Sequence, residues 1–368
     1  MIRKQIVFLA FFWSFFSPQS VEAETLRVIL MEVRGVVRLT STQPFSVQPG
    51  GSQVSGGAAY QVTEISLRKG IAVNGIDSLQ KTLTFIPQHG GKLFINGSPY
   101  AGSLIFKAKN GGLSVVNEVD IEQYLKGVVP AEMPSDWPME ALKTQAVISR
   151  TYALYQKGKN RNSEYDLPAS VLGQVYKGES AHHPRATEAI AKTKGLIAMY
   201  NGSPALTYFH STSAGPTEDA NDRWGVDAPY LKGVSCPLDF ASPYFGWQRD
   251  IPLSDLENAL DKAGVGIIAT LTPLSYSKAG RILMVRILHS RGETFLKAEE
   301  LRRLLGYKIL PSTHFKIDSF GKTLKIIGMG WGHGVGLCQW GTKIMAERGL
   351  KFDEIVRHYY PGVELKAY

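Results

Sequence analysis

Hydrophobic and polar residues alternate along the first third of the chain. Residues 26–33, 60–67 and 81–86 show this two-residue period together with many β-branched side chains, which is typical of half-buried β-strands. Clusters of Gly, Pro, Asn and Ser separate these segments and predict turns. We therefore expect a β-rich region over residues 24–112. It would end at the Gly-Gly pair 111–112, unless strand pairing continues across that pair.

Beyond this region the pattern changes to helical spacing. Small and apolar residues recur every three or four positions between 142 and 153, which predicts one packing stripe on a helix. Ser135 or Asp136 is expected to cap the start of this helix, and Gly158 to end it. Pro184 and Gly195 bracket a second expected helix in the same way.

The remaining segments mix strands and short helices. The Asn-Gly pair at 201–202 predicts a tight β-hairpin of strands 196–200 and 203–209, which leads into a loop at 210–215. Further patterns predict a strand at 281–289, a helix at 298–305, a hairpin at 315–327 and helices at 343–347 and 353–359. We therefore expect the α+β fold class, with residues 113–368 forming one mixed region after the β-rich start.

The first residues resemble a secretory leader. Arg3 and Lys4 precede an apolar run at 6–16, and small residues then lead to Ala23. We expect residues 1–23 to be a cleaved signal peptide and the mature protein to be exported to the periplasm or the extracellular cell wall. The apolar run is shorter than the roughly 20 residues of a spanning helix, so no stable membrane span is expected after cleavage. The alternative is an uncleaved anchor.

Composition and charge narrow the choice of partner. A hydrophobic content of 44% excludes a disordered chain, and a net charge of +9 suits an anionic polymer. Lysine and arginine are dispersed and no nucleic-acid module is visible, so we expect no nucleic-acid partner. The two cysteines, Cys236 and Cys338, could form one disulfide or remain buried thiols, and the sequence leaves both possibilities open.

Five short motifs in residues 113–368 carry a family resemblance. They are Val128-Val-Pro-Ala-Glu-Met-Pro134 with the run 140–154 behind it, Gln174-Val-Tyr-Lys-Gly178, Thr207-Tyr-Phe-His-Ser-Thr-Ser-Ala-Gly215, Gly330-Trp-Gly-His-Gly-Val-Gly-Leu-Cys-Gln-Trp-Gly341 and His358-Tyr-Tyr-Pro-Gly362. In this order they resemble the stage II sporulation protein D (SpoIID/LytB) family of bacterial cell-wall proteins. The resemblance implies a SpoIID-type mixed domain behind the β-rich N-terminal region.

The resemblance also implies an activity. Members of this family are lytic transglycosylases, which cut the bond between N-acetylmuramic acid and N-acetylglucosamine without water and leave an anhydromuramic end, or close relatives that modulate wall amidases. The residue that matches the catalytic acid is Glu132. The implied partners are peptidoglycan glycan strands and a cell-wall amidase.

The chemistry of Glu132 can also be argued from its neighbours. Glycosidic cleavage needs a protonated carboxyl beside the leaving oxygen. Glu132 lies in an apolar segment that we expect to be a loop stiffened by Pro130 and Pro134. The alternative is an ordinary loop carboxylate ahead of a helix. No second catalytic carboxylate is evident, since Asp136 is expected to cap a helix, and this favours transglycosylation over hydrolysis.

A second set of residues is expected to bind substrate. Arg150 lies on an apolar helix face and needs an anionic partner, either Glu132 or an acidic group of the glycan. The alternative is an arginine that extends to the surface or forms a structural ion pair. Hydroxyl-rich and aromatic positions in the Thr207 and Gly330 motifs complete the set: Tyr208, Ser211, Thr212, Ser213, Trp331 and His333. The alternatives for these residues are turn formation and core packing.

No metal site and no cofactor are expected. His333 has no His or Cys partner at metal-ligand spacing. Some clostridial family members carry cysteines and a histidine just before the segment that matches residues 174–176, and this chain has neither there. A second hypothesis about function stays open, which is a non-catalytic wall-binding protein that enhances an N-acetylmuramoyl-L-alanine amidase.

Overall fold

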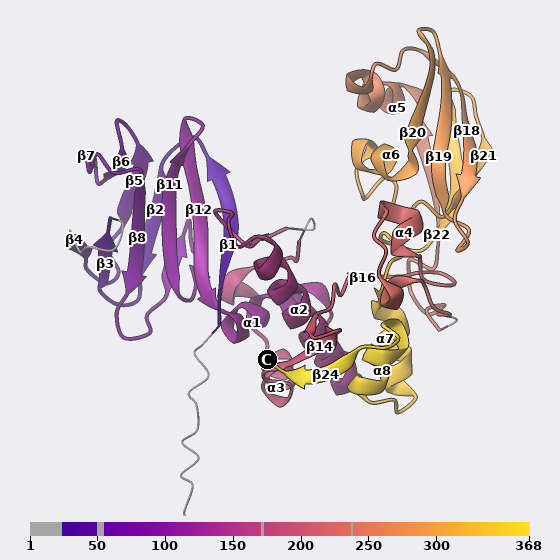
Figure 1. The fold of residues 1–368 in the computed structure, drawn as a ribbon. Helices are drawn as coiled ribbons and strands as arrows, with labels where there is room; N and C mark the ends of the chain where they lie inside the picture. The colour runs from indigo at the N-terminus through magenta and orange to yellow at the C-terminus, as the bar shows by residue number, and fades with distance from the viewer. Residues whose placement is uncertain (1–23, 50–54, 171–172, 237) are drawn as a thin grey trace, which may run out of the picture.

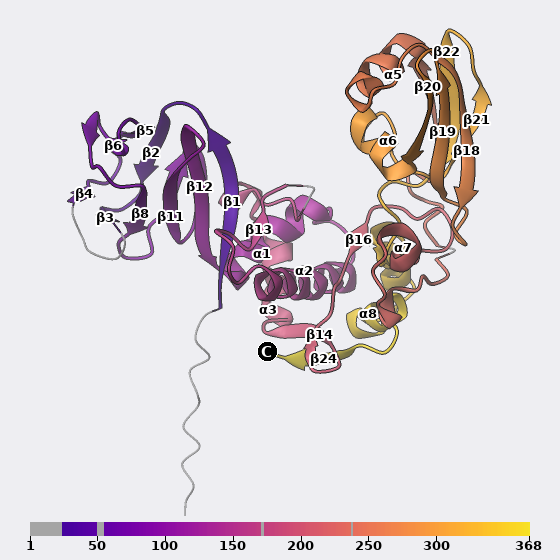
Figure 2. The ribbon, with the colours of Figure 1, turned by 45° about the horizontal axis from the view of Figure 1, so that its top comes forward.

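The computed structural model describes residues 24–49, 55–170, 173–236 and 238–368. The signal peptide expected at residues 1–23 lies outside these residues. The described chain forms a β-rich body, a helical centre and an outer lobe, and the body and the lobe lie on opposite sides of the centre in both views (Figures 1 and 2). Strands and helices occur in both halves of the chain, which confirms the α+β class.

Two sheets build the N-terminal body. The seven-stranded sheet has the order β13 (Leu167–Pro168), β1 (Thr25–Val33), β12 (Gly112–Asp120), β11 (Ser103–Lys109), β8 (Thr82–Pro87), β3 (Phe45–Gln48) and β4 (Ser55–Gly57). The six-stranded sheet has the order β10 (Ser98–Tyr100), β9 (Leu93–Ile95), β2 (Val37–Ser41), β5 (Thr63–Leu67), β6 (Ile71–Val73) and β7 (Ile76–Asp77). Alternate residues of both sheets, such as Leu39, Phe85 and Phe106, share one buried cluster.

The strand β12 connects this body to the helical centre. It begins at Gly112 and pairs with both β1 and β11, so strand pairing continues across the Gly-Gly pair. At its end the Asp120 carboxylate accepts hydrogen bonds from the backbone N–H groups of Glu122 (2.9 Å) and Gln123 (3.0 Å). This N-cap starts helix α1 (Ile121–Glu132) directly after the sheet.

Two local predictions about this region are wrong. Glu132 is the last residue of α1, with Pro130 inside its final turn, and does not lie in a loop. Helix α2 (Met139–Lys159) begins after Pro138, so neither Ser135 nor Asp136 caps it. The physical reason is Pro138, because a proline disfavours helical backbone at the residue before it.

A buried ion pair ties the helical centre together. The Arg150 guanidinium of α2 donates from Nε (2.8 Å) and Nη2 (2.7 Å) to the two carboxylate oxygens of Glu122 on α1. It also donates to the carbonyl oxygens of Leu196 (3.1 Å) and Ile190 (3.5 Å). Ile190 belongs to α3 (Pro184–Lys192) and Leu196 to β14 (Leu196–Tyr200). One side chain thus joins four elements.

The C-terminal segments return to this centre. The strand β14 pairs with β15 (Ser203–Pro204) across the predicted turn, and with the final strand β24 (Glu364–Ala367). Residues 207–209 leave the expected hairpin, because β16 (Phe209–His210) pairs in parallel with β23 (Leu337–Cys338). Helices α7 (Gln339–Glu347) and α8 (Phe352–Tyr359) then pack with α2 around a second core.

The outer lobe has its own core. One sheet has the order β17 (Gly246–Pro252), β22 (Thr323–Met329) and β21 (Phe315–Ser319), and the other β18 (Ile268–Tyr276), β19 (Ile282–His289) and β20 (Gly292–Lys297). Helices α5 (Leu253–Leu260) and α6 (Ala298–Leu305) pack with them, and α6 matches the predicted range 298–305. The short helix α4 (Ala220–Trp224) lies between lobe and centre (Figure 1). Within the described residues, every helix is too short or too polar to cross a bilayer.

We predict that Arg150→Met destabilises the fold by about 3–5 kcal/mol, because it leaves the Glu122 carboxylate without its partner in a largely buried position. Urea unfolding followed by circular dichroism measures the change. The control is Lys192→Met, which breaks a solvent-exposed pair with Glu188 and should leave the unfolding midpoint near that of the wild type. Equal midpoints for all three proteins would contradict the structural role of Arg150.

Candidate active site

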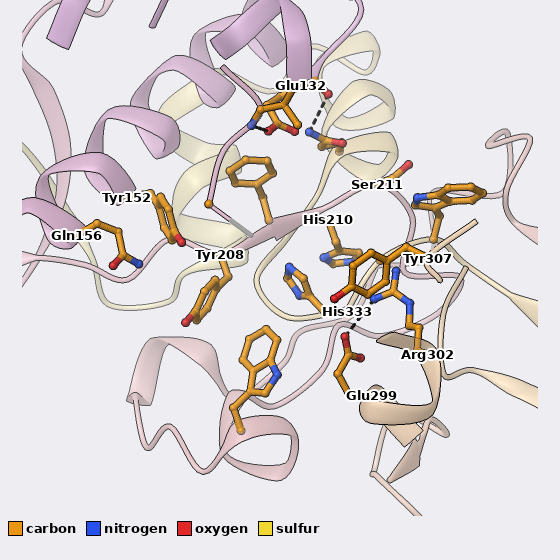
Figure 3. A pocket seen from close by; sticks show the side chains of 17 residues that line it. Glu132, Tyr152, Gln156, Tyr208, His210, Ser211, Glu299, Arg302, Tyr307 and His333 are labelled. Atoms are coloured by element: carbon orange, nitrogen blue, oxygen red, sulfur yellow. Dashed lines mark hydrogen bonds and ion pairs between the residues drawn. The ribbon is translucent and has the colours of Figure 1, made fainter. Parts of the chain in front are cut away.

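A pocket of about 650 Å³ opens where the helical centre meets the outer lobe. Its walls come from α1, α2, α4, α6 and the two glycine-containing motifs around β16 and β23 (Figure 3). The lining residues are Glu132, Tyr152, Gln156, Gly173, Val175, Tyr208, Phe209, His210, Ser211, Trp224, Glu299, Arg302, Tyr307, Trp331, Gly332, His333 and Gln339. Segments more than two hundred positions apart along the chain thus share one cavity.

Glu132 presents its carboxyl to this pocket from the end of α1. Its Oε1 accepts a hydrogen bond from the Val175 backbone N–H at 2.6 Å, and its backbone carbonyl accepts one from Gln339 Nε2 at 3.0 Å. Desolvation raises the pKa of the Glu132 carboxyl to about 7, although the Val175 hydrogen bond acts in the opposite direction. The protonated carboxyl is therefore well populated near neutral pH.

The other acid that lines the pocket is differently placed. Glu299 of α6 forms ion pairs with Arg223 and Arg302. It lies across the pocket from Glu132 in Figure 3. Among the lining residues, Glu132 is therefore the acid without a cationic partner, and the pocket offers one proton donor rather than a pair of free carboxylates.

Aromatic side chains form a continuous row along one wall. The ring of Tyr208 lies 6.0 Å from that of Tyr152 and 4.8 Å from that of Trp224, and Trp224 lies 5.0 Å from the ring of His333. Gln156, one turn beyond Tyr152 on α2, adds an amide to the same side (Figure 3). Large apolar faces next to a few polar groups are typical of a small-molecule or oligosaccharide site.

Two histidines in the pocket are held as opposite tautomers by one residue. His210 Nδ1 lies 3.2 Å from the Val335 carbonyl oxygen and must therefore donate a proton to it. His333 Nδ1 accepts from the Val335 N–H at 3.0 Å, which places the His333 proton on Nε2. Burial lowers the pKa of His210 to about 3 and that of His333 well below its ordinary value. Both rings are therefore neutral.

The glycine-rich motif allows these elements to approach one another. Gly332 has φ +109°, and a Cβ on it would come within 2.7 Å of the His210 Cβ. The backbone around it pairs with the Thr207 motif through a bridge between Thr212 and Trp331. A side chain at position 332 would therefore force the two motifs apart.

The structure brings together five of the residues expected at the site. Glu132, Tyr208, Ser211, Trp331 and His333 all line the pocket.

Three other expected substrate-binding residues do not line the pocket. Arg150 is fully buried and forms an ion pair with Glu122. Its place in the structure is therefore that of the structural ion pair, the alternative to substrate binding. Thr212 is buried with its hydroxyl 2.7 Å from the Ser242 hydroxyl, and Ser213 donates to Asp239 at 3.1 Å.

Other lining residues were not predicted. Tyr152 and Gln156 are four positions apart on α2, a spacing that places them on one helix face and could have identified them once Glu132 was assigned. Glu299, Arg302 and Tyr307 come from the outer lobe. No local signal in the sequence connects that lobe with Glu132, because only the tertiary arrangement brings α6 to the pocket.

The two cysteines lie close together outside the pocket. Both are buried free thiols, and their sulfur atoms and an Asp239 oxygen all lie within 4.8 Å of one another. Asp239 is already bonded to the Ala214 N–H at 2.7 Å, and Cys236 Sγ lies 3.2 Å from the Tyr359 hydroxyl. This is the one group of three potential metal ligands in the described parts of the chain. The expectation of a metal-free protein stays a prediction.

Comparisons with known proteins agree with the motifs. The family model described as stage II sporulation protein matches residues 109–200, and a domain of unknown function, DUF8618, matches residues 238–336, which include the outer lobe. An uncharacterised protein of Brachyspira hyodysenteriae is 36% identical over 83% of this chain and 82% of its own length. Stage II sporulation protein D of Bacillus amyloliquefaciens is 32% identical over 83% of this chain and 90% of its own length.

A further relative carries a different name. The amidase enhancer of Bacillus subtilis is 30% identical over 66% of this chain and 40% of its own length. The identity and coverage of these relatives, together with the matching family model, are sufficient to assign the family. The chain belongs to the stage II sporulation protein D family.

Proposed function

We propose that this protein is an exported lytic transglycosylase that cleaves the bond between N-acetylmuramic acid and N-acetylglucosamine in peptidoglycan glycan strands. Glu132 is its single general acid and base. The observation that carries the proposal is the Glu132 carboxyl, which has a pKa raised to about 7 and lies in the pocket without a cationic partner. A carboxyl that is protonated near neutral pH can donate to a glycosidic oxygen.

The proposed reaction has two proton transfers through one carboxyl. Glu132 protonates the glycosidic oxygen as the bond from C1 of the muramic acid to that oxygen breaks. The C6 hydroxyl of the same muramic acid attacks C1 and returns its proton to the carboxylate, which forms the 1,6-anhydro ring and restores the acid. The Val175 N–H occupies Oε1, so the proton is carried by Oε2. No second carboxylate is required, in contrast to glycoside hydrolysis.

Several features support the proposed export and the proposed binding to the cell wall. The net charge of +9 favours binding to an anionic wall. The aromatic row and Gln156 suit a polymer of amide-bearing sugars. Export rests on the expected signal peptide and on the family, whose relatives include an amidase enhancer.

That relative also supports a second candidate function, the enhancement of a wall amidase without cleavage of glycan. The two functions differ in their products. Purified glycan strands incubated with this protein alone should release anhydromuramic ends if it is a transglycosylase. Faster release of peptides from peptide-bearing strands by an added amidase with this protein than without it, with strands left uncut by this protein alone, would favour the second function.

We predict that Glu132→Gln lowers the rate of strand cleavage by about 10²- to 10⁴-fold or more, because an amide cannot deliver the proton. Binding to strands should persist, since the side chain keeps its shape. Saccharide release measured by mass spectrometry and binding measured by calorimetry separate the two effects. Glu188→Gln, at an exposed position on α3, should cleave like the wild type. A variant Glu132→Gln with wild-type rate would exclude Glu132 as the acid.

We also predict that kcat/KM is constant in mild acid and falls as pH rises through about 7, because only the protonated Glu132 is active and its pKa is raised to about 7. The same shift affects stability. A carboxyl whose pKa is raised by folding loses stabilising free energy as pH rises from its ordinary 4.5 through about 7. Urea unfolding of the wild type relative to Glu132→Gln should show this loss. A flat rate profile between about pH 5 and 9, a range that spans the raised pKa of about 7, would contradict the assignment.

A further inference from the structure

The wall of the pocket opposite Glu132 is backed by a cluster with more buried positive than negative charge. Three arginines with at most 8% exposure interact electrostatically in this cluster, Arg223, Arg281 and Arg302. Two carboxylates accompany them, Glu218 and Glu299, and burial raises the pKa of Glu218. The neighbouring histidines are neutral, so they neither add to nor cancel this charge. At least one positive charge therefore has no counterpart in this cluster.

The hydrogen bonds of the cluster leave donors unused. Arg223 and Arg302 share the one carboxylate of Glu299. The Nε atoms of Arg223 and Arg281 are buried without a hydrogen-bond partner. A buried cation without a counterion is costly, and the missing anion can be supplied by a ligand.

Arg302 is the arginine of this cluster that lines the pocket. Its Nε donates to the Leu310 carbonyl oxygen at 3.0 Å, and its Nη1 donates to Glu299 at 3.3 Å. The Tyr307 ring lies 4.6 Å from the guanidinium carbon and holds it in place. Its Nη2 has no hydrogen-bond partner in the part of the chain that the structure describes.

A second donor lies on the same side of the pocket. The Val335 N–H fixes the His333 proton on Nε2, so this half-buried ring can only donate from that atom. Arg302 is among the charges that hold the pKa of His333 low, after burial and His210, and both side chains line the pocket, with Tyr307 next to Arg302 in Figure 3. A guanidinium and a neutral N–H donor that line the same pocket can both donate to a carboxylate.

We propose that Arg302 and His333 form a subsite for a carboxylate of the wall polymer, which makes the outer lobe a specificity element of the pocket. This proposal rests on the proposed function for the identity of the polymer. Two sources offer the same chemistry: the lactyl carboxylate of a muramic acid without its peptide, and the carboxylates of the stem peptide. A neutral ligand would leave the excess charge of the cluster unmatched.

The first test changes the ligand and uses the Glu132→Gln protein, so that binding is measured without cleavage. Calorimetry compares three soluble strands: peptide-free strands, the same strands with their lactyl carboxylates converted to neutral methylamides, and peptide-bearing strands. If the lactyl group is the source, the methylamide should bind roughly 10- to 100-fold more weakly than the free acid, the range expected for a charge-assisted hydrogen bond. If the stem peptide is the source, peptide-bearing strands should instead bind more tightly than both others by a similar factor.

The second test changes the protein in the same background. Arg302→Gln should weaken binding of the favoured strand by a similar factor and leave the methylamide strand unaffected, while Arg302→Lys should retain part of the binding. The matched control is Arg303→Gln, which removes the same charge from an exposed neighbour paired with Glu300. Thermal unfolding verifies that each variant folds. If Arg302→Gln does not fold, the comparison of the three strands with the Glu132→Gln protein alone tests the proposal.

The proposal is overturned if all three strands bind Glu132→Gln within about twofold of one another, or if Arg303→Gln weakens binding as much as Arg302→Gln. These outcomes differ from a failure of the proposed function, in which the wild type would leave glycan strands uncut whatever their charge. Binding is measured independently of cleavage.

Discussion

The site requires that the Glu132 carboxyl be kept away from water at the end of α1. Desolvation raises its pKa to about 7, and any movement that admitted water or a cation would lower it. The fold supports this position from both sides. The Asp120 cap joins α1 to the N-terminal sheet, the Arg150–Glu122 pair fixes α1 against α2 and α3, and the Val175 N–H orients the carboxyl itself.

The rest of the pocket is assembled around that position by long-range pairing. The parallel pair of β16 and β23 brings the Thr207 and Gly330 motifs together, and glycines in the second motif permit backbone contact that a side chain would block. One consequence is that Val335 sets the tautomers of both His210 and His333. The outer lobe then closes the pocket with α6. Glu132 and the opposite wall of the pocket thus belong to parts of the chain with separate hydrophobic cores. Both parts line the cavity.

The sequence predicted the parts of this arrangement that have local signals. The helix at 298–305 and the turn at 201–202 follow from periodicity and turn chemistry, and the motif around Glu132 pointed to a residue that lines the pocket. The element that carries Glu132 was mispredicted, since closely spaced prolines suggested a loop although Pro130 is tolerated in the last turn of α1. Arg150 was mispredicted for another reason. Its apolar helix face correctly required an anionic partner, but that partner is Glu122, 28 residues away, and only the fold selects it over a substrate.

The central claim is that one carboxyl breaks the glycosidic bond without water. The most direct test is to digest peptide-free glycan strands with this protein in water labelled with heavy oxygen. Mass spectrometry then measures the masses of the newly formed strand ends. We expect anhydromuramic ends that contain no heavy oxygen, because the C6 hydroxyl of the sugar is the nucleophile. Reducing ends that each contain one heavy oxygen atom would show hydrolysis, and would contradict the single-acid mechanism assigned to Glu132.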